Sequence, residues 1–202
     1  MSFEIELKIK LQGNDKQKIE EFMSSSNFKG SFEGGFEQTD HYFDTKDPSF
    51  AKNDTALRIR VEIPIFRSDE TKKTIEITYK GKKLNPNSKT RLEYNLNLVP
   101  GTSFQAVEGL LNELGFINSI HIFKKRLNYL LEPGVILSLD TNELGDFVEI
   151  EKIADDKNLI ETTENYLWEY LQRIIGPLSK DRRIVKSYLE LILESKMVKL
   201  SS

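Results

Sequence analysis

The sequence predicts an α+β protein built on an antiparallel β-barrel, with amphipathic helices covering the outside. Three observations support this fold class. Several segments alternate charged and apolar residues with a period of two, as strands with two different faces do. Short polar connections separate many of these segments, which favours antiparallel pairing. Helical apolar stripes occur between the strands and after them.

Residues 3–9 form the clearest predicted strand. Glu4, Glu6 and Lys8 share one face, and the apolar residues between them share the other. Two carboxylates about 7 Å apart along a strand, followed by an ammonium group, suit one half of a metal-phosphate site better than a solvent-exposed face. A turn at residues 13–15 then starts a short helix, which ends near residues 24–27.

The middle of the chain repeats the alternation. Arg58 and Arg60 share one face of a predicted strand, and Glu76 and Lys80 share one face of another. We expect a charged hairpin loop at residues 64–73 and a polar turn at residues 81–89. The predicted strands of this part are residues 32–37 (with a glycine bend), 38–45, 56–63, 74–81 and 91–98.

A capped helix and three more strands follow. Thr102 or Ser103 can cap the helix, whose apolar face begins at Phe104 and which ends near Gly115. Strands are expected at residues 120–132, 135–140 and 147–152. Apolar stripes at residues 167–175 and 184–192 predict two C-terminal helices. No linker divides the chain, so we expect one domain at residues 1–196 and a frayed tail at residues 197–202.

Composition limits the classes of function. The 202 residues are 38% hydrophobic and 30% charged, and they include no cysteine and only two histidines. A metal would therefore sit on carboxylates, which favours Mg²⁺ or Mn²⁺. A net charge of −3 does not favour a nucleic-acid-binding surface. Without a signal peptide or membrane span, the sequence predicts a cytoplasmic protein and no membrane partner.

The charged faces of the strands could simply be the solvated side of an ordinary sheet. Both signs of charge, however, recur at the same phase on strand after strand. A closed barrel with a charge-lined interior explains this repetition and leaves no edge strands. Because unpaired buried charge is unfavourable, such an interior needs a charged guest. Arginines and lysines suit a polyanion, and the carboxylates suit one or two divalent cations, so a polyphosphate with bound metal fits both sets.

At this point the sequence resembles the CYTH domain, or triphosphate tunnel metalloenzyme, family. The short ExExK pattern is Glu4-Ile5-Glu6-Leu7-Lys8. The supporting motifs follow in the family's order over nearly the whole chain. They are residues 40–44 (DHYFD), 57–60 (LRIR), 79–81 (YKG), 91–93 (RLE), 124–126 (KKR), 145–151 (GDFVEIE) and 187–191 (SYLEL).

The resemblance implies an antiparallel eight-stranded tunnel that binds a triphosphate with Mg²⁺ or Mn²⁺. Glu76 and Glu93 either balance charge or contact metal. The matching metal-site acids are Glu4, Glu6, Asp140, Glu149 and Glu151. The matching phosphate-binding bases are Lys8, Arg58, Arg60, Lys80, Arg91, Lys124 and Arg126, of which we assign catalytic roles to Lys8, Arg58, Lys80 and Arg126.

Three functions remain open from the sequence. The leading one is metal-dependent hydrolysis of tripolyphosphate or of a nucleoside or thiamine triphosphate. The second is a class IV adenylyl cyclase, in which the ribose 3′-hydroxyl of ATP attacks the α-phosphorus and pyrophosphate leaves. The third is a module that only binds polyphosphate, against which the large set of acids argues. The partner is a triphosphate-containing small molecule in each case, and a homodimer is kept as a candidate assembly.

Overall fold

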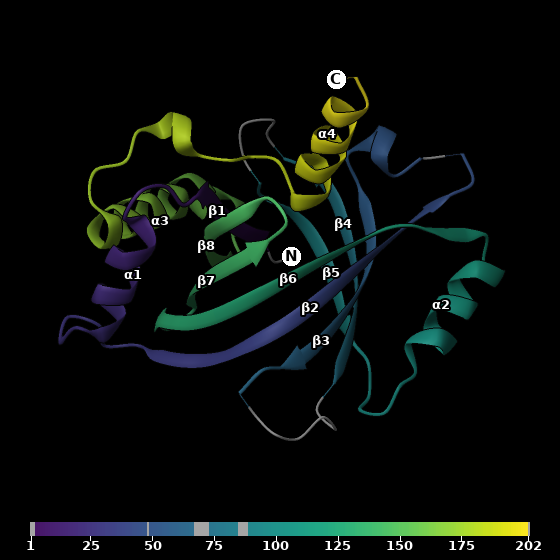
Figure 1. The fold of residues 1–202 in the computed structure, drawn as a ribbon, viewed down its shortest axis with the longest axis horizontal. Coiled ribbons are helices and arrows are strands. Elements are labelled where there is room, and N and C mark those ends of the chain that lie inside the picture. Colours follow the sequence, from purple (N-terminus) through teal and green to yellow (C-terminus); the bar gives the residue numbers. More distant parts are fainter. Residues whose placement is uncertain (1–2, 48, 67–72, 85–88, 202) are drawn as a thin grey trace.

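The protein is a closed antiparallel barrel of eight strands in the computed structural model, which describes residues 3–47, 49–66, 73–84 and 89–201 (Figure 1). Around the barrel the strand order is β1-β5-β4-β3-β2-β6-β7-β8. The strands are β1 (Phe3–Lys10), β2 (Ser31–Thr45), β3 (Ala56–Pro64), β4 (Thr74–Lys83), β5 (Arg91–Asn97), β6 (Phe116–Glu132), β7 (Val135–Asn142) and β8 (Gly145–Ala154). The predicted fold class is therefore confirmed.

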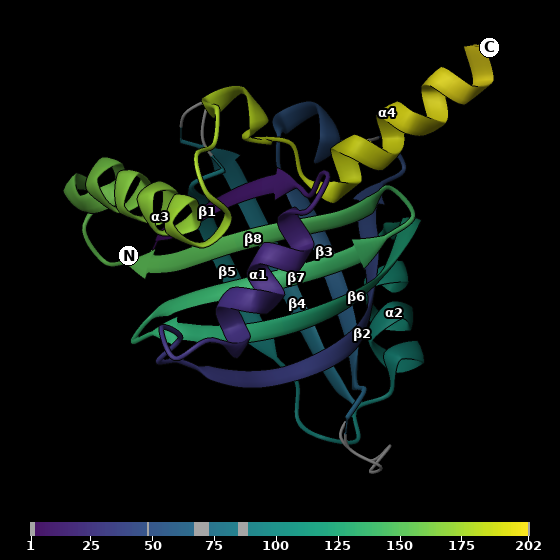
Figure 2. The same cartoon turned by 60° about the vertical axis from the view of Figure 1, so that its left-hand side comes forward.

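Four helices lie outside the barrel (Figure 2). They are α1 (Asp15–Ser24), α2 (Phe104–Glu113), α3 (Ile160–Ile175) and α4 (Tyr188–Ser201). Short 3₁₀ turns occupy Ala51–Asn53, Lys157–Leu159 and Lys180–Arg182. Ser103 caps α2, because its hydroxyl accepts a hydrogen bond from the Ala106 amide. No helix among the described residues is both long and apolar enough to cross a membrane.

Two of the three apolar clusters among the described residues lie between the barrel and the helices outside it, and the third joins β2, β6 and β8 to α4. On β1 the side chains of Ile5, Leu7 and Ile9 are fully buried and pack against α3 residues such as Leu167 and Leu171. A second cluster joins α2 to the outer face of β2, β3 and β4. Because successive strand residues point to opposite faces, this outer packing directs the alternate, charged residues inward.

Strand β1 closes the barrel, and its pairing with β5 on one side is much shorter than its pairing with β8 on the other. Strand β1 pairs with β8 over the whole of its length, from Phe3 opposite Ala154 to Lys10 opposite Phe147. On its other side β1 pairs with β5 at only two positions, Phe3 and Glu4. The β1–β8 register therefore sets how the charged residues of the first strand meet those of the last.

Several element boundaries differ from the sequence prediction. Residues 32–37 and 38–45 form the single strand β2, which continues through irregularities at residues 32–34 and 42–43 instead of breaking. Strand β6 starts at Phe116, because the turn at Gly115 leads directly into pairing with Thr45. Ile184 and Val185 precede α4, and this helix continues past Met197 to Ser201, where a frayed tail was expected. The domain boundary at residue 196 stays a prediction.

Parts of two predicted loops lie outside the described residues. They are residues 67–72 of the charged hairpin loop and residues 85–88 of the polar turn.

Candidate functional site

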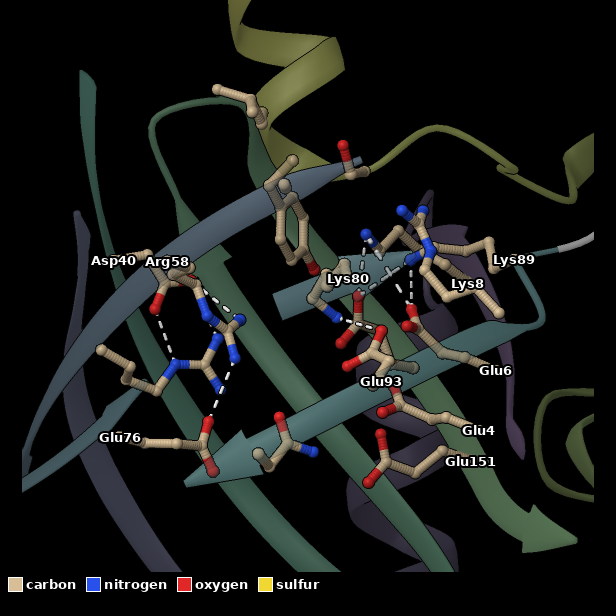
Figure 3. A pocket seen from close by; sticks show the side chains of 18 of the residues that line it. Glu4, Glu6, Lys8, Asp40, Arg58, Glu76, Lys80, Lys89, Glu93 and Glu151 are labelled. Atoms are coloured by element: carbon tan, nitrogen blue, oxygen red, sulfur yellow. Dashed lines mark hydrogen bonds and ion pairs between the residues drawn. The ribbon is translucent and has the colours of Figure 1, made fainter. Parts of the chain in front are cut away.

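The inside of the barrel holds a cavity of about 210 Å³ that is lined almost entirely by charged and polar side chains (Figure 3). Eleven of the twelve predicted site residues line it. They are Glu4, Glu6, Lys8, Arg58, Arg60, Lys80, Arg91, Lys124, Arg126, Glu149 and Glu151. The exception is Asp140, which is buried behind Arg126 and Lys124 and does not line the cavity.

Strand register explains four of the ion pairs in and around the cavity. Residues directly opposite each other on neighbouring antiparallel strands bring their side chains close together on one face. Three such opposite pairs are also salt bridges: Arg60 with Asp40, Arg126 with Asp140, and Lys8 with Glu149. Lys80 and Glu93 form a fourth. The barrel thus neutralises much of its own interior charge.

One wall of the cavity is an arginine pair held by Asp40. Arg60 donates to both carboxylate oxygens of Asp40, at 2.6 and 2.8 Å, and Arg58 Nη1 lies 3.5 Å from the same carboxylate. Although burial alone would raise it, the pKa of Asp40 is well below its usual range because Arg60 and Arg58 stabilise the anion. Both guanidinium groups are therefore fixed in position.

Arg58 keeps one donor free. Its Nη2 donates to Thr78 Oγ1 at 2.9 Å and to Glu76 Oε1 at 3.2 Å, but its buried Nε has no hydrogen-bond partner within the described residues. Buried polar groups are rarely left unpaired in a native structure. Arg58 lines the cavity, and the positive charge of its guanidinium group suits an anionic ligand there.

A second basic group surrounds Asp140. Arg126 donates to the two oxygens of Asp140 at 2.6 and 2.5 Å, and Lys124 Nζ donates to it at 3.0 Å. The Tyr188 hydroxyl, at the start of α4, donates to the same carboxylate at 2.9 Å. Asp140 therefore already has four hydrogen bonds and acts here as the support of the two cations, while its predicted metal role stays a prediction.

Lysines hold the carboxylates at the centre of the cavity. Lys8 Nζ lies 2.8 Å from Glu149 and 4.0 Å from Glu6. Lys89 donates to Glu6 and lies 3.6 Å from Glu149. Burial lowers the pKa of Lys8 to about 7, an effect that Glu149 opposes and Lys89 reinforces.

The far end of the cavity is acidic. Glu6 and Glu151 are opposite each other on β1 and β8, which brings two carboxylates face to face. Burial raises the pKa of Glu151 to about 8, and the nearby Glu4 carboxylate adds to the shift. Burial likewise raises the pKa of Glu4, against the effect of Lys80 and with that of Glu93. Neither Glu4 nor Glu151 forms an ion pair within the described chain, and Figure 3 shows them apart from Arg58.

These acids fit a divalent cation. They offer oxygen ligands only, which suits Mg²⁺ or Mn²⁺. The raised pKa values of Glu4 and Glu151 mean that desolvation disfavours their charged forms, which a bound metal would stabilise. The site is not assembled in advance, since no three acidic or histidine side chains of the described residues converge tightly enough to hold a metal. In this arrangement Glu149 is paired with Lys8 and Glu6 with Lys89.

Sequence reasoning missed three residues of the site. Asp40 lies in the motif of residues 40–44 without a predicted role, Lys89 in the predicted polar turn, and Tyr188 in the predicted apolar stripe. The phase of Lys89 was a usable signal, because it precedes Arg91 and Glu93 by steps of two. Nothing in the sequence separates Tyr188 from ordinary helix packing.

The structure also gives the contacts of Glu76 and Glu93, whose roles the sequence leaves open, and of Lys125 and His41. Glu76 and Glu93 both pair with cations, Arg58 at 3.2 Å and Lys80 at 2.5 Å, so they balance charge in this structure. Lys125 points outward, as expected, and pairs with Glu37 on the surface at 3.2 Å. His41 packs against Phe104 of α2, with ring centroids 4.2 Å apart.

Fold and site together define an eight-stranded antiparallel tunnel whose interior carries both charge signs. The family model described as the CYTH domain matches residues 2–185. The chain belongs to the CYTH domain family, which confirms the resemblance seen in the sequence.

Relatives agree with this assignment. A Methanocaldococcus jannaschii protein named "putative adenylate cyclase" is 34% identical over 187 residues, which cover 93% of this chain and 98% of that protein. A solved structure from Pyrococcus horikoshii has a TM-score of 0.80 at 31% identity and covers 95% of this chain and 99% of its own. A Vibrio parahaemolyticus structure, at 17% identity, shares the fold with a TM-score of 0.76 over 94% and 97% of the two chains. Family membership implies an enzyme that acts on a triphosphate with a divalent metal.

Proposed function

We propose that the protein hydrolyses a triphosphate inside the tunnel with the help of Mg²⁺ or Mn²⁺. The observation that carries this proposal is the pair of arginines, Arg58 and Arg60, that Asp40 holds at the wall of the cavity. Arginine donors pair well with phosphate oxygens, and charge-assisted hydrogen bonds are the strong ones.

Each set of residues has a separate task in this mechanism. Arg58, Arg60 and Arg126 bind and orient the phosphates, with Lys8, Lys80, Arg91 and Lys124 completing the cationic surroundings. Asp40 and Asp140 keep these cations in place. Glu4, Glu6, Glu149 and Glu151 would hold the metal, which supplies charge neutralisation and polarises water when bound. Catalysis then depends on positioning and electrostatic stabilisation, with no covalent intermediate on the protein.

Adenylyl cyclase activity is the second candidate, and one structural observation favours it. A groove of about 590 Å³ adjoins the tunnel mouth and shares Ala56, Arg91 and Ser187 with the cavity. Such a groove is large enough for an organic group attached to the phosphates. The name of the M. jannaschii relative points the same way. A Hippeastrum protein of the same fold, 19% identical with a TM-score of 0.57, is described as having a dominant triphosphatase activity despite its cyclase name.

Product analysis separates the candidates. The purified protein is incubated with tripolyphosphate and, separately, with ATP, in the presence of Mg²⁺ or Mn²⁺. Orthophosphate with pyrophosphate from tripolyphosphate supports hydrolysis. Cyclic AMP with pyrophosphate from ATP supports the cyclase. Binding of both compounds without turnover of either would overturn both enzymatic proposals in favour of a binding module.

A further inference from the structure

Four charged groups alternate in sign at the centre of the cavity. Lys8 and Lys89 are the cations, and Glu6 and Glu149 are the anions. Each lysine lies within 4.0 Å of both carboxylates. All four side chains are nearly inaccessible to solvent. This arrangement balances the charge of the two glutamates without any metal.

The two lysines are not held equally. Lys8 lies within β1, and its Nζ sits 3.6 Å from the centre of the Tyr188 ring, a cation–π contact that fixes its position. Lys89 precedes β5 and belongs to no strand. Within the described residues, the contacts of its ammonium group are with Glu6, Glu149 and Lys8. Lys89 is therefore the cation of this group that can leave with the least disturbance of the barrel.

Glu6 is close both to a second carboxylate and to an ammonium group. Glu6 lies directly opposite Glu151 on the neighbouring strand, so two carboxylates meet at one register position of the acidic end. A divalent cation shared by these acids would relieve the repulsion. An ammonium group bound to Glu6 at the same time would place positive charge beside the metal, which is strongly unfavourable in a buried site.

We propose that Lys89 occupies the place of the metal at Glu6, leaves that carboxylate when a divalent cation binds, and then turns to the phosphates of the substrate. This inference rests on the proposed function, because it assumes that Glu6 is a metal ligand. It adds an exchange of counter-ions that couples metal loading to phosphate binding. Lys89 is a positioning residue in this exchange.

Metal binding without substrate tests the first half of the exchange. Mn²⁺ affinity is measured by calorimetry for the wild type, Lys89→Gln and Lys89→Arg. Loss of the competing cation should tighten Mn²⁺ binding by about tenfold or more in Lys89→Gln, whereas Lys89→Arg keeps the competitor and should bind as the wild type does. Lys82→Gln is the matched control, since it removes the same charge from an exposed position near the end of β4; it should change the affinity by less than about twofold.

A double variant ties the effect to Glu6. In a Glu6→Gln background the Lys89→Gln substitution should no longer tighten Mn²⁺ binding, because the shared carboxylate is gone. Equal effects of Lys89→Gln and Lys82→Gln, or an effect of Lys89→Gln that persists without Glu6, would overturn the proposal. Thermal unfolding of each variant confirms that it is folded before its affinity is compared.

The second half of the exchange is tested with saturating Mn²⁺ and a triphosphate analogue whose bridging oxygens are replaced by imido groups. Lys89→Gln should bind the analogue about tenfold more weakly than the wild type, and Lys82→Gln should not. Unchanged analogue affinity in Lys89→Gln would overturn the transfer of Lys89 to the phosphates. None of these readouts needs turnover. A protein that shows the exchange but hydrolyses no triphosphate would therefore refute the proposed function alone.

Discussion

The two ends of the tunnel interior are built in opposite ways. The basic wall consists of Arg58, Arg60, Lys124 and Arg126, and each of these cations pairs with Asp40 or Asp140. At the acidic end Glu4 and Glu151 lie half-buried without an ion pair in the described chain, and desolvation raises their pKa values. The cations are thus positioned before any ligand arrives, whereas the acids are incomplete until a cation joins them.

The difference suggests which half of the site depends on a ligand. Guanidinium forks on buried carboxylates have a defined geometry and little freedom to rearrange. Carboxylates that face each other repel, so their arrangement is favourable only with positive charge between them. Four predictions follow from this contrast, and they begin with the largest expected effect.

Removal of the divalent cation should abolish turnover while leaving the barrel folded. The acidic end then lacks its cation, but the ion pairs of the basic wall remain. Activity is measured in excess chelator and again after addition of Mg²⁺ or Mn²⁺, which should restore it. Chelator already saturated with Mg²⁺ is the control. Full turnover in excess free chelator would exclude a metal at the acidic end.

Arg126→Ala should destabilise the protein by about 3–5 kcal/mol, because it leaves Asp140 and Glu149 as buried carboxylates with a missing partner. The basic wall would then be part of the fold as well as of the site. Urea unfolding gives the free-energy difference. Lys125→Ala, one residue away but on the surface, should change stability by less than about 1 kcal/mol. Similar values for the two variants would show that the buried fork contributes nothing special.

Glu6→Gln keeps the side-chain shape but removes the negative charge that a metal needs. Turnover at saturating substrate should fall by roughly 10- to 100-fold, with partial rescue by more metal. The measurement is kcat as a function of Mn²⁺ concentration. Glu37→Gln, the same substitution outside the barrel, should leave kcat unchanged. If Glu6→Gln behaved like Glu37→Gln, the first strand would be structural.

Glu151 should make the metal-free protein less stable as pH rises. Its pKa is about 8 in the folded state and 4.5 in the unfolded chain, so the folded state binds more protons between these pH values. The stabilisation is complete below pH 4.5 and is lost as pH rises through 8. The free energy of unfolding is measured with urea, in the presence of chelator, at pH 5 and at pH 8. Between these two pH values it should fall by about 1–2 kcal/mol more in the wild type than in Glu151→Gln. Equal losses in the two proteins would assign the pH dependence to other groups.

Much of the site could be read from strand phase. The alternation in residues 3–9 correctly directed Glu4, Glu6 and Lys8 into the interior, because apolar neighbours at a period of two leave only one face for the charges. The same logic located Arg58, Arg60, Lys124 and Arg126. It failed for the division of β2, because the predicted boundary between residues 37 and 38 falls inside a continuous strand, whose irregularities lie at residues 32–34 and 42–43.

Lys89 and Tyr188 show where phase is not enough. Lys89 contacts Glu6, which is 83 positions away in the sequence, and Tyr188 contacts Asp140, which is 48 positions away. Local patterns carry no information on such separations. Both residues enter the cavity because a connection and a helix end meet the barrel there.

The sequence by itself determined which face of each strand is charged, and with it the class of fold and the signs of charge in the interior. Only the tertiary structure decided which acid meets which base. That outcome depends on barrel register, which sets Arg126 opposite Asp140 but Glu6 opposite Glu151. Side-chain direction is a local property of a strand, whereas the balance of charge is a property of pairs that only closure of the barrel brings together.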